Sequence, residues 1–364
     1  MDKPSILIVK LSAIGDVVHT LPALNALRRY YPQAHIAWLV EEAAANLVSG
    51  HPALDRLLVS HRKTWLKGLG SPQWRQHANQ IKAFVKSMRD RPYDMVFDFQ
   101  AALKGAALIA LVRGKRKIGF GPGLEHQELS HLVLNERVPA VSMDIHALER
   151  GLIMLQAVGI PTPSVEYRLP IKPSHRLRAD QFLSKYGIDA QQAFAVINPM
   201  AKWETKLWRI DRFAQVADRV QRELHLPVVF TGGSEDNAYV KAIKDQMKSQ
   251  ALNISGQTDL LTLAALLERA ALMITTDTGP MHIAAAVGTP TVALFGPTAP
   301  WRTGPYGEGH RILRSSRACC PCFKRACPQA SACMSDISVD QVVSAAAELA
   351  ERVCQAPRIA VIKD

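Results

Sequence analysis

The sequence lacks any apolar run that approaches the roughly 20 residues a helix needs to span a bilayer. Its opening, MDKPSILIVKLSAIGDVV, carries a lysine but runs straight into a strand-like pattern without a small-residue cleavage site, unlike a secretory signal peptide. No helix-turn-helix, RNA-binding or zinc-finger spacing is present, which argues against nucleic acid as a partner. The sequence therefore predicts a cytoplasmic globular protein that does not bind nucleic acid.

Cysteine is scarce outside one short segment. Five of the six cysteines lie in ACCPCFKRACPQASAC, so a dispersed disulfide framework is excluded. The C-x2-C step from Cys319 to Cys322 is a common metal-ligand spacing, and with Cys327 and Cys333 these thiolates could bind zinc or an iron–sulfur cluster. The segment has no second step of this kind, and free thiols or a disulfide fit it equally.

Acidic residues are the minority, since 44 Lys and Arg face 32 Asp and Glu and give a net charge of +12. This balance favours anionic partners such as phosphorylated small molecules or membrane surfaces. The length of 364 residues suffices for two domains, each with its own core. Prolines are dense around residues 161–175, which predicts a linker there. We expect domains at 1–172 and 173–345, with 346–364 as a tail that packs back on the first domain.

Short apolar segments that alternate with helical patterns predict an α/β fold with parallel strands. The first segment, Ile6–Val9, opens into a loop that carries Ser12, Gly15 and Asp16. Such a loop lies at the carboxyl edge of the sheet, where open α/β sheets bind ligands. The Asp16 carboxylate could cap the next helix or act as a general base in a cleft.

Two further features of the first half carry polar residues. Gln100 follows the predicted strand Met95–Phe99, and Lys104 lies on an otherwise apolar helix, where it either extends to solvent or contacts a ligand. His61–Arg75 mixes basic residues with tryptophan and leucine, which suits a solvated surface or a membrane interface. Lys115–Lys117 adds a second basic cluster.

The stretch Thr275–Thr298, TTDTGPMHIAAAVGTPTVALFGPT, predicts a strand, a polar turn, a proline-led helix and a second strand. Backbone N–H groups at the helix start favour a phosphate, although an ordinary capped helix would have the same pattern. Lys206 follows the predicted strand Phe194–Ile197. Gly232-Gly233-Ser234-Glu235-Asp236 follows another strand, and its acids could cap a helix or bind a ribose.

Over nearly its whole length the chain resembles glycosyltransferase family 9, the bacterial lipopolysaccharide heptosyltransferases. The matching segments are ILIVKLSAIGDVVHTLPAL, NPMAKWETKLWRIDRF, VVFTGGSEDN and TTDTGPMHIAAAVGTPTVALFGPT. The resemblance implies an α/β fold of the GT-B type, with two Rossmann-like domains facing each other across a cleft. The first would bind a lipid-linked sugar acceptor and the second a nucleotide sugar, usually ADP-heptose. Transfer would invert the anomeric centre without a bound metal.

The resemblance also implies roles for single residues. Asp16 matches the catalytic base, Lys206 a lysine near the donor phosphates and Glu235 an acid near the ribose. The full expectation is donor binding by Lys206, Glu235, Asp277, Thr278, Gly279 and His282, and acceptor binding by Ser12, Gly15, Gln100 and Lys104. The chain departs from the family where Asp-x-Gln-Gly is usual, because Ala101 follows Asp98-Phe99-Gln100. The cysteine-rich stretch occurs in only part of the family.

The predicted function is transfer of heptose from ADP-heptose to the lipid A–core (Kdo) acceptor, at the inner face of the inner membrane. One alternative is a family member that uses another nucleotide sugar, and a second is a GT-B-fold sugar-nucleotide epimerase. A binding protein without catalysis is a third, against which the presence of both Asp16 and Lys206 argues. The acceptor position and the oligomeric state stay open.

Overall fold

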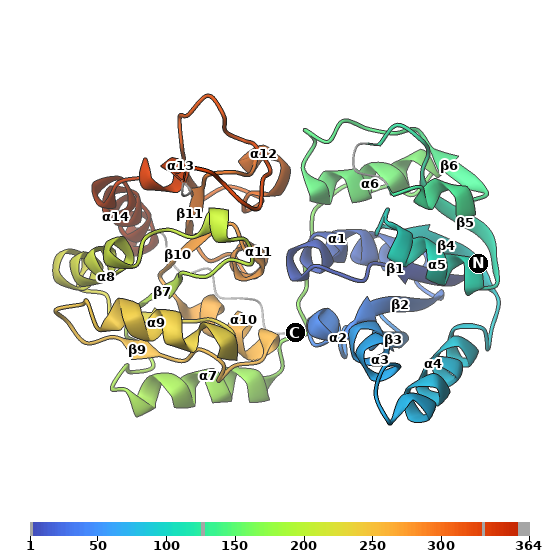
Figure 1. Cartoon of the computed structure of the whole chain (residues 1–364), viewed down its shortest axis with the longest axis horizontal. Helices are drawn as coiled ribbons and strands as arrows, with labels where there is room; N and C mark the ends of the chain where they lie inside the picture. The colour runs from blue at the N-terminus through green and yellow to red at the C-terminus, as the bar shows by residue number, and fades with distance from the viewer. Residues whose placement is uncertain (1–2, 125–127, 330–331, 356–364) are drawn as a thin grey trace. The chain divides into compact units, whose positions relative to one another are not determined.

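The chain folds into two compact units, Met1–Pro170 and Ile171–Asp364. The structure is a computed structural model, and it describes residues 3–124, 128–329 and 332–355. Each unit contains one six-stranded parallel sheet with helical connections (Figure 1). The predicted α/β class with two Rossmann-like domains is confirmed.

In the first unit the strands follow the order β3-β2-β1-β4-β5-β6. Every neighbouring pair is parallel, so all six carboxyl ends lie at the same edge. From β1, the chain adds strands β2 and β3 on one side, and then β4, β5 and β6 on the other side. The carboxyl ends of β1 and β4 therefore form the switch point, where such sheets bind ligands. The strands are β1 (Ser5–Val9), β2 (His35–Glu41), β3 (Arg56–Ser60), β4 (Tyr93–Asp98), β5 (Gly114–Phe120) and β6 (Glu136–Val138).

Helices of the first unit connect these strands. The longest, α1, begins directly after the β1 loop, and its residues Val17, Val18, Leu21 and Leu24 are fully buried. The helices are α1 (Ile14–Tyr30), α2 (Glu42–Ala45), α3 (Arg62–Gly68), α4 (Trp74–Met88), α5 (Leu103–Leu111), the 3-10 turn η1 (Ser130–Val133) and α6 (Ala147–Ala157).

The strands of the second unit follow the order β12-β11-β10-β7-β8-β9, which is the order of the first unit written from the opposite edge of the sheet. All neighbouring pairs are again parallel. Its switch point lies between β7 and β10. The strands are β7 (Ala195–Asn198), β8 (Val228–Phe230), β9 (Leu252–Asn253), β10 (Leu272–Thr276), β11 (Thr291–Phe295) and β12 (Arg311–Arg314).

Helices of the second unit include α11, whose Pro280 stands at the second helical position, where no backbone N–H is required. The helices are α7 (Pro173–Lys185), the 3-10 turn η2 (Glu204–Lys206), α8 (Ile210–Leu224), the 3-10 turn η3 (Ser234–Asp236), α9 (Asn237–Lys244), α10 (Leu260–Arg269), α11 (Gly279–Ala286), α12 (Pro300–Thr303), α13 (Ala332–Ser335) and α14 (Val339–Gln355). Residues 346–355 of the predicted tail belong to α14, which packs against α8. Residues 356–364 lie outside the described part of the chain.

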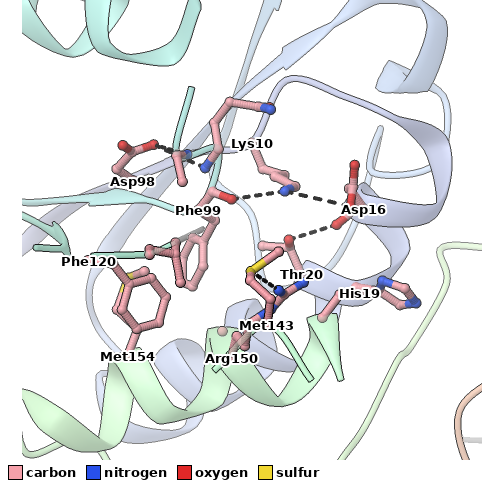
Figure 2. A pocket seen from close by; sticks show the side chains of 15 residues that line it. Lys10, Asp16, His19, Thr20, Asp98, Phe99, Phe120, Met143, Arg150 and Met154 are labelled. Atoms are coloured by element: carbon pink, nitrogen blue, oxygen red, sulfur yellow. Dashed lines mark hydrogen bonds and ion pairs between the residues drawn. The ribbon is translucent and has the colours of Figure 1, made fainter. Parts of the chain in front are cut away.

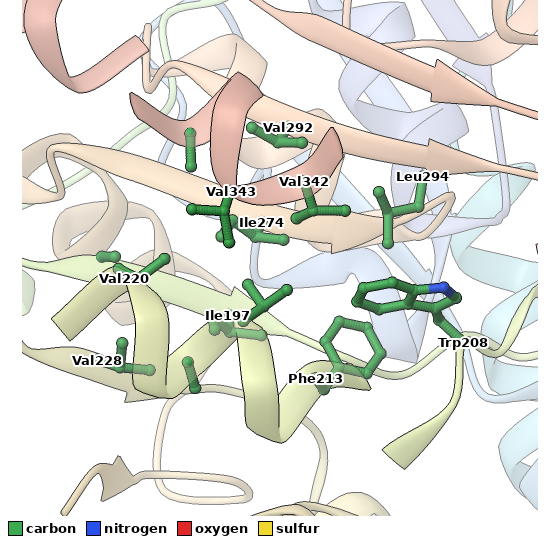
Figure 3. Packing of buried hydrophobic residues seen from close by; sticks show 14 of the residues in the cluster. Ile197, Trp208, Phe213, Val220, Val228, Ile274, Val292, Leu294, Val342 and Val343 are labelled. Atoms are coloured by element: carbon green, nitrogen blue, oxygen red, sulfur yellow. The ribbon is translucent and has the colours of Figure 1, made fainter. Parts of the chain in front are cut away.

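The core of the second unit forms between the sheet and the helices α8 and α14 (Figure 3). Apolar side chains of α8 recur at Phe213, Val216, Ala217 and Val220, a helical spacing that places them on one buried face. Phe213 meets the Trp208 ring edge-on with the ring centres 5.0 Å apart. The Trp208 indole N–H donates to the carbonyl of Ile337 at 3.1 Å, so its one polar atom is satisfied inside the core.

One expectation for a basic segment needs correction. Trp65 is buried rather than exposed, because its ring packs 5.1 Å from that of Phe84 on α4. Lys115–Lys117 lies on strand β5, where Lys115 pairs with Asp94 and Arg116 pairs with Glu136. Among the described residues, no helix combines the length and apolar character of a membrane span.

We expect Phe213→Ala to lower the unfolding free energy of the second unit by about 3–5 kcal/mol, because it leaves a cavity beneath Trp208. Differential scanning calorimetry, in which the two units can melt separately, measures the loss. Gln215→Ala is the control, since Gln215 is exposed on the same helix. Equal melting of the two variants would contradict this packing.

Candidate active site

The β1 loop places Asp16 in the first turn of α1. One carboxylate oxygen, Oδ2, accepts a hydrogen bond from the backbone N–H of Ala13 at 2.8 Å, and so caps the helix. The other, Oδ1, lies 3.9 Å from Nζ of Lys10, and the side chain is 41% exposed. Capping therefore occupies one oxygen and leaves the second beside a cation and open to solvent. Gly15 is buried in the same turn.

Lys10 is a residue that the sequence did not single out. Its ammonium group donates to the carbonyl of Phe99 at 2.9 Å, which ties the β1 loop to the β4 loop (Figure 2). The side chain is only 13% exposed, so its charge is held close to Asp16. Its position directly after β1, six residues before Asp16, was the available signal.

Gln100 holds the β1 loop from the other side of the switch point. Its Oε1 accepts hydrogen bonds from the backbone N–H groups of Leu11 at 2.8 Å and Ser12 at 3.2 Å. This side-chain carbonyl is thus committed to positioning the loop. The predicted acceptor residue therefore shapes the site through the backbone that it holds.

Asp98 and Ala101 fix the turn that carries Gln100. Oδ1 of Asp98 accepts from the backbone N–H groups of Gln100 and Ala101, each at 3.0 Å. Burial raises the pKa of Asp98, although these two donors oppose the shift. Ala101 has φ of 50°, a left-handed conformation that favours glycine. The turn thus explains why glycine is usual at this position, and Ala101 adopts it nonetheless.

Lys104 and Ser12 meet directly, because the Lys104 ammonium group donates to the Ser12 hydroxyl. Nζ of Lys104 also lies 3.9 Å from Oε1 of buried Glu41, which Arg62 contacts at 3.1 Å. Burial lowers the pKa of Lys104, while Glu41 opposes the shift. The lysine therefore does not simply extend to solvent. It belongs to a polar network around the β1 loop.

A pocket of about 220 Å³ opens at the switch point of the first unit. Asp16 and Gln100 line it together, whereas Ser12, Gly15 and Lys104 are not among its lining residues. Figure 2 shows Asp16 and Lys10 on one side and the rings of Phe99 and Phe120 on another. The lining residues are Lys10, Asp16, His19, Thr20, Asp98, Phe99, Gln100, Ala101, Phe120, Leu124, Met143, Ala147, Arg150, Gly151 and Met154.

In the second unit, Asp277 joins three neighbouring strand exits. Its Oδ2 accepts from Nζ of Lys206 at 2.6 Å and from the hydroxyl of Thr298 at 2.7 Å. The Lys206 and Asp277 side chains are 15% and 7% exposed, so this ion pair is largely desolvated. Thr298 was not predicted as a site residue, and its position three residues after the end of β11 was the only signal. The contact brings two predicted donor residues together.

The start of α11 stands next to this ion pair. Thr278 is the N-cap residue, Gly279 the first helical residue, and His282 a buried side chain one turn later. The Thr278 side chain makes no capping hydrogen bond. Backbone N–H groups of the first turn therefore face this edge of the sheet, where they can receive an anion.

For Glu235 and Asp236 the sequence left two roles open, helix capping and ribose binding, and the structure places the two side chains differently. Oδ2 of Asp236 accepts from the backbone N–H of Gly233 at 2.7 Å and so caps the turn. Glu235 is exposed, and its Oε2 accepts from the Ser234 hydroxyl at 3.3 Å. The turn thus leaves the Glu235 carboxylate accessible at the exit of β8.

The cysteines from Cys319 to Cys333 are free thiols rather than disulfides. Burial, and to a lesser extent the neighbouring Cys333, raise the pKa of Cys320 to about 12. Burial likewise raises the pKa of Cys333. Within the described ranges, no group of three or more His, Cys, Asp or Glu side chains is arranged to hold a metal ion.

A family model, curated relatives and solved structures all indicate the same family. The family model of glycosyltransferase family 9 (heptosyltransferase) matches residues 81–332. The lipopolysaccharide core heptosyltransferase OpsX of Haemophilus influenzae is 29% identical over 85% of this chain and 84% of its own. A glycosyl transferase family 9 structure from Veillonella parvula superposes with a TM-score of 0.79 at 26% identity and covers 98% of both chains.

A second solved structure supports the fold. The E. coli heptosyltransferase WaaC with ADP has a TM-score of 0.76 at 24% identity, over 95% of this chain and 99% of its own. The family model spans more than half of the chain, including the β4 loop, Lys206, Glu235 and the whole of α11. The chain therefore belongs to glycosyltransferase family 9, the heptosyltransferase family.

Proposed function

We propose that this protein transfers heptose from ADP-heptose to the lipid A–core (Kdo) acceptor of lipopolysaccharide, with inversion. Family membership and the heptosyltransferase activity of its relatives support the reaction class. The observation that carries the proposal is Asp16, a carboxylate with one oxygen left open in a pocket at the switch point. Asp16 would be the base, and Lys206 with the start of α11 would receive the donor diphosphate.

The residues can meet the demands of the reaction. As the acceptor hydroxyl oxygen attacks the anomeric carbon of the donor, its proton would pass to Oδ1 of Asp16. A new glycosidic bond forms, the bond from the anomeric carbon to the phosphate oxygen breaks, and ADP leaves. Lys206 and the N–H groups of α11 would oppose the charge that develops on ADP. The reaction as proposed needs no bound metal.

Each remaining site residue has a proposed task. Glu235 would bind the ribose hydroxyls, and Asp277 and His282 would lie nearest the sugar and pyrophosphate. In the first unit, Gln100 would act by holding the β1 loop, while Lys104 with Ser12 would contact the acceptor. Any zinc or iron–sulfur group on the cysteines would take no part in transfer.

The proposed location is the cytoplasmic face of the inner membrane, with α3 and α4 as the contact. The segment from Arg62 to Arg89 holds seven lysines and arginines and no acidic residue. Leu66, Leu69 and Trp74 are exposed within it, at 58%, 42% and 49%. Exposed apolar side chains among basic ones suit an anionic membrane surface.

Asp16→Asn should lower turnover by about 10²–10⁴-fold, the usual effect of removing a general base. Asparagine can still accept the Ala13 N–H, so the helix cap survives. Asp16→Ala should lose the same activity and, in addition, about 0.5–2 kcal/mol of stability. Both should bind ADP within a few fold of the parent. Mass spectrometry of heptose-deficient lipopolysaccharide incubated with ADP-heptose measures transfer, and near-parental turnover of Asp16→Asn would refute the assignment.

Lys206→Ala should weaken the binding of ADP-heptose and of ADP about ten- to a hundred-fold, since a charge-assisted contact contributes about 1.5–3 kcal/mol. Glu235→Ala should weaken both ligands through the ribose. Isothermal titration calorimetry measures each affinity. The proposed donor site is wrong if both variants bind ADP as tightly as the parent.

Two controls separate binding from folding in this titration. Lys206→Ala leaves Asp277 buried without its cation, which can cost about 3–5 kcal/mol of stability. The double variant Lys206→Met with Asp277→Asn removes that unpaired charge and should still bind ADP weakly. Lys241→Ala, on exposed α9 surface, tests for a general effect of lost positive charge.

Lys63→Gln combined with Lys67→Gln should reduce binding to anionic vesicles at least ten-fold, because each basic residue contributes about 1 kcal/mol near such a surface. Trp74→Ala should reduce it further, and raised salt should weaken binding by the parent. Co-sedimentation with phosphatidylglycerol vesicles measures this. The control is Lys115→Gln with Lys117→Gln on β5. Sedimentation that responds neither to salt nor to the α3 variants would rule out this surface.

A further inference from the structure

The cysteine-bearing loop of the second unit, residues 316–329, is hydrogen-bonded at two points to the loops that follow β11 and β7. The backbone N–H groups of Cys322 and Phe323 donate to the carbonyl of Pro297, at 3.0 Å and 2.8 Å. The hydroxyl of buried Thr205 donates to the carbonyl of Lys324 at 2.8 Å. The tip of this loop is thus fixed between the exits of β11 and β7.

These hydrogen bonds place Arg325 beside Trp203, whose ring also contacts Lys206. The Arg325 guanidinium carbon lies 5.2 Å from the centre of the Trp203 ring. Nζ of Lys206 lies 4.5 Å from the centre of the same ring. The two cations therefore cannot be farther apart than the sum of these distances.

The charge balance of the site calls for a second cation. Asp277 pairs with Lys206 at 2.6 Å, so this pair brings no net charge to a bound anion. A nucleotide diphosphate carries more than one negative charge. Arg325, in contrast, has no carboxylate partner among the residues that the structure describes. Its planar guanidinium also matches the oxygens of a phosphate in pairs.

We propose that Arg325 is a further donor-binding residue, whose guanidinium group binds the diphosphate of the nucleotide sugar beside Lys206. The inference rests on the proposed function and extends its donor site to the cysteine-bearing loop. Trp203 would hold the guanidinium in place through its ring face. Thr205 would act as a positioning residue, since its hydroxyl anchors the loop backbone next to Arg325.

The test is calorimetric titration of ADP into the full chain. Arg325→Gln should weaken the binding of ADP about ten-fold, equivalent to about 1.4 kcal/mol. Arg325→Lys should recover part of the loss, because it restores the charge without the paired N–H donors. Inorganic pyrophosphate, measured by displacement of ADP, should lose affinity by the same factor in Arg325→Gln. Glu235→Ala should leave pyrophosphate unchanged, since its proposed contact is with the ribose.

Lys324→Gln is the matched control, because it removes one positive charge from the neighbouring exposed position on the same loop. Parental affinity in Arg325→Gln, or an equal loss in Lys324→Gln, overturns the inference. If Lys206→Ala weakens ADP and Arg325→Gln does not, the donor site stands and only the role of Arg325 falls. If the parent itself binds no ADP, the proposed function falls and takes the inference with it.

Discussion

Parallel strand pairing is the constraint on which the arrangement of functional side chains depends. In each unit the order places the first and fourth strands side by side at the centre, so their exits meet at the switch point. Asp16 follows β1 and Gln100 follows β4, whereas Lys206 follows β7 and Asp277 follows β10. Residues about 70 to 90 positions apart in sequence thus reach hydrogen-bond distance, as Lys206 and Asp277 do at 2.6 Å.

The two units differ in how far the carboxylate at this edge is buried. In the first, backbone N–H groups of the β1 loop are satisfied by Gln100, which leaves Asp16 with one oxygen open to solvent. In the second, the Asp277 carboxylate is buried and occupied by Lys206 and Thr298. A base must remain accessible to a proton donor, whereas a donor-binding ion pair can be desolvated and exchange partners with an arriving phosphate. The difference in burial between Asp16 and Asp277 suits the proposed difference in role.

Apolar patterning predicted the central strands well, because β1, β4, β7, β10 and β11 are buried on both faces. It missed the edge strand β12, whose half-buried and exposed residues alternate, and it did not predict that the basic residues 115–117 belong to a strand, β5. Trp65 could not be placed from sequence, because its burial depends on Phe84 in the next helix. Single roles such as that of Gln100 likewise depend on contacts across 88 positions or more, which no local pattern contains.

The cysteine segment acquires a structural role from its contacts with the β11 exit. A side-chain carbon added at Gly296 would lie 2.6 Å from Sδ of Met334 and 2.8 Å from Sγ of Cys333, so this turn packs directly on the sulfur atoms. Pro297, the next residue, accepts the two N–H groups that fix the loop tip. Since Thr298 then contacts Asp277, a chain of adjoining residues links buried Cys333 to the Lys206–Asp277 ion pair. Any change in bulk or charge at Cys333 must therefore be accommodated at the turn that positions both Thr298 and the loop of Arg325.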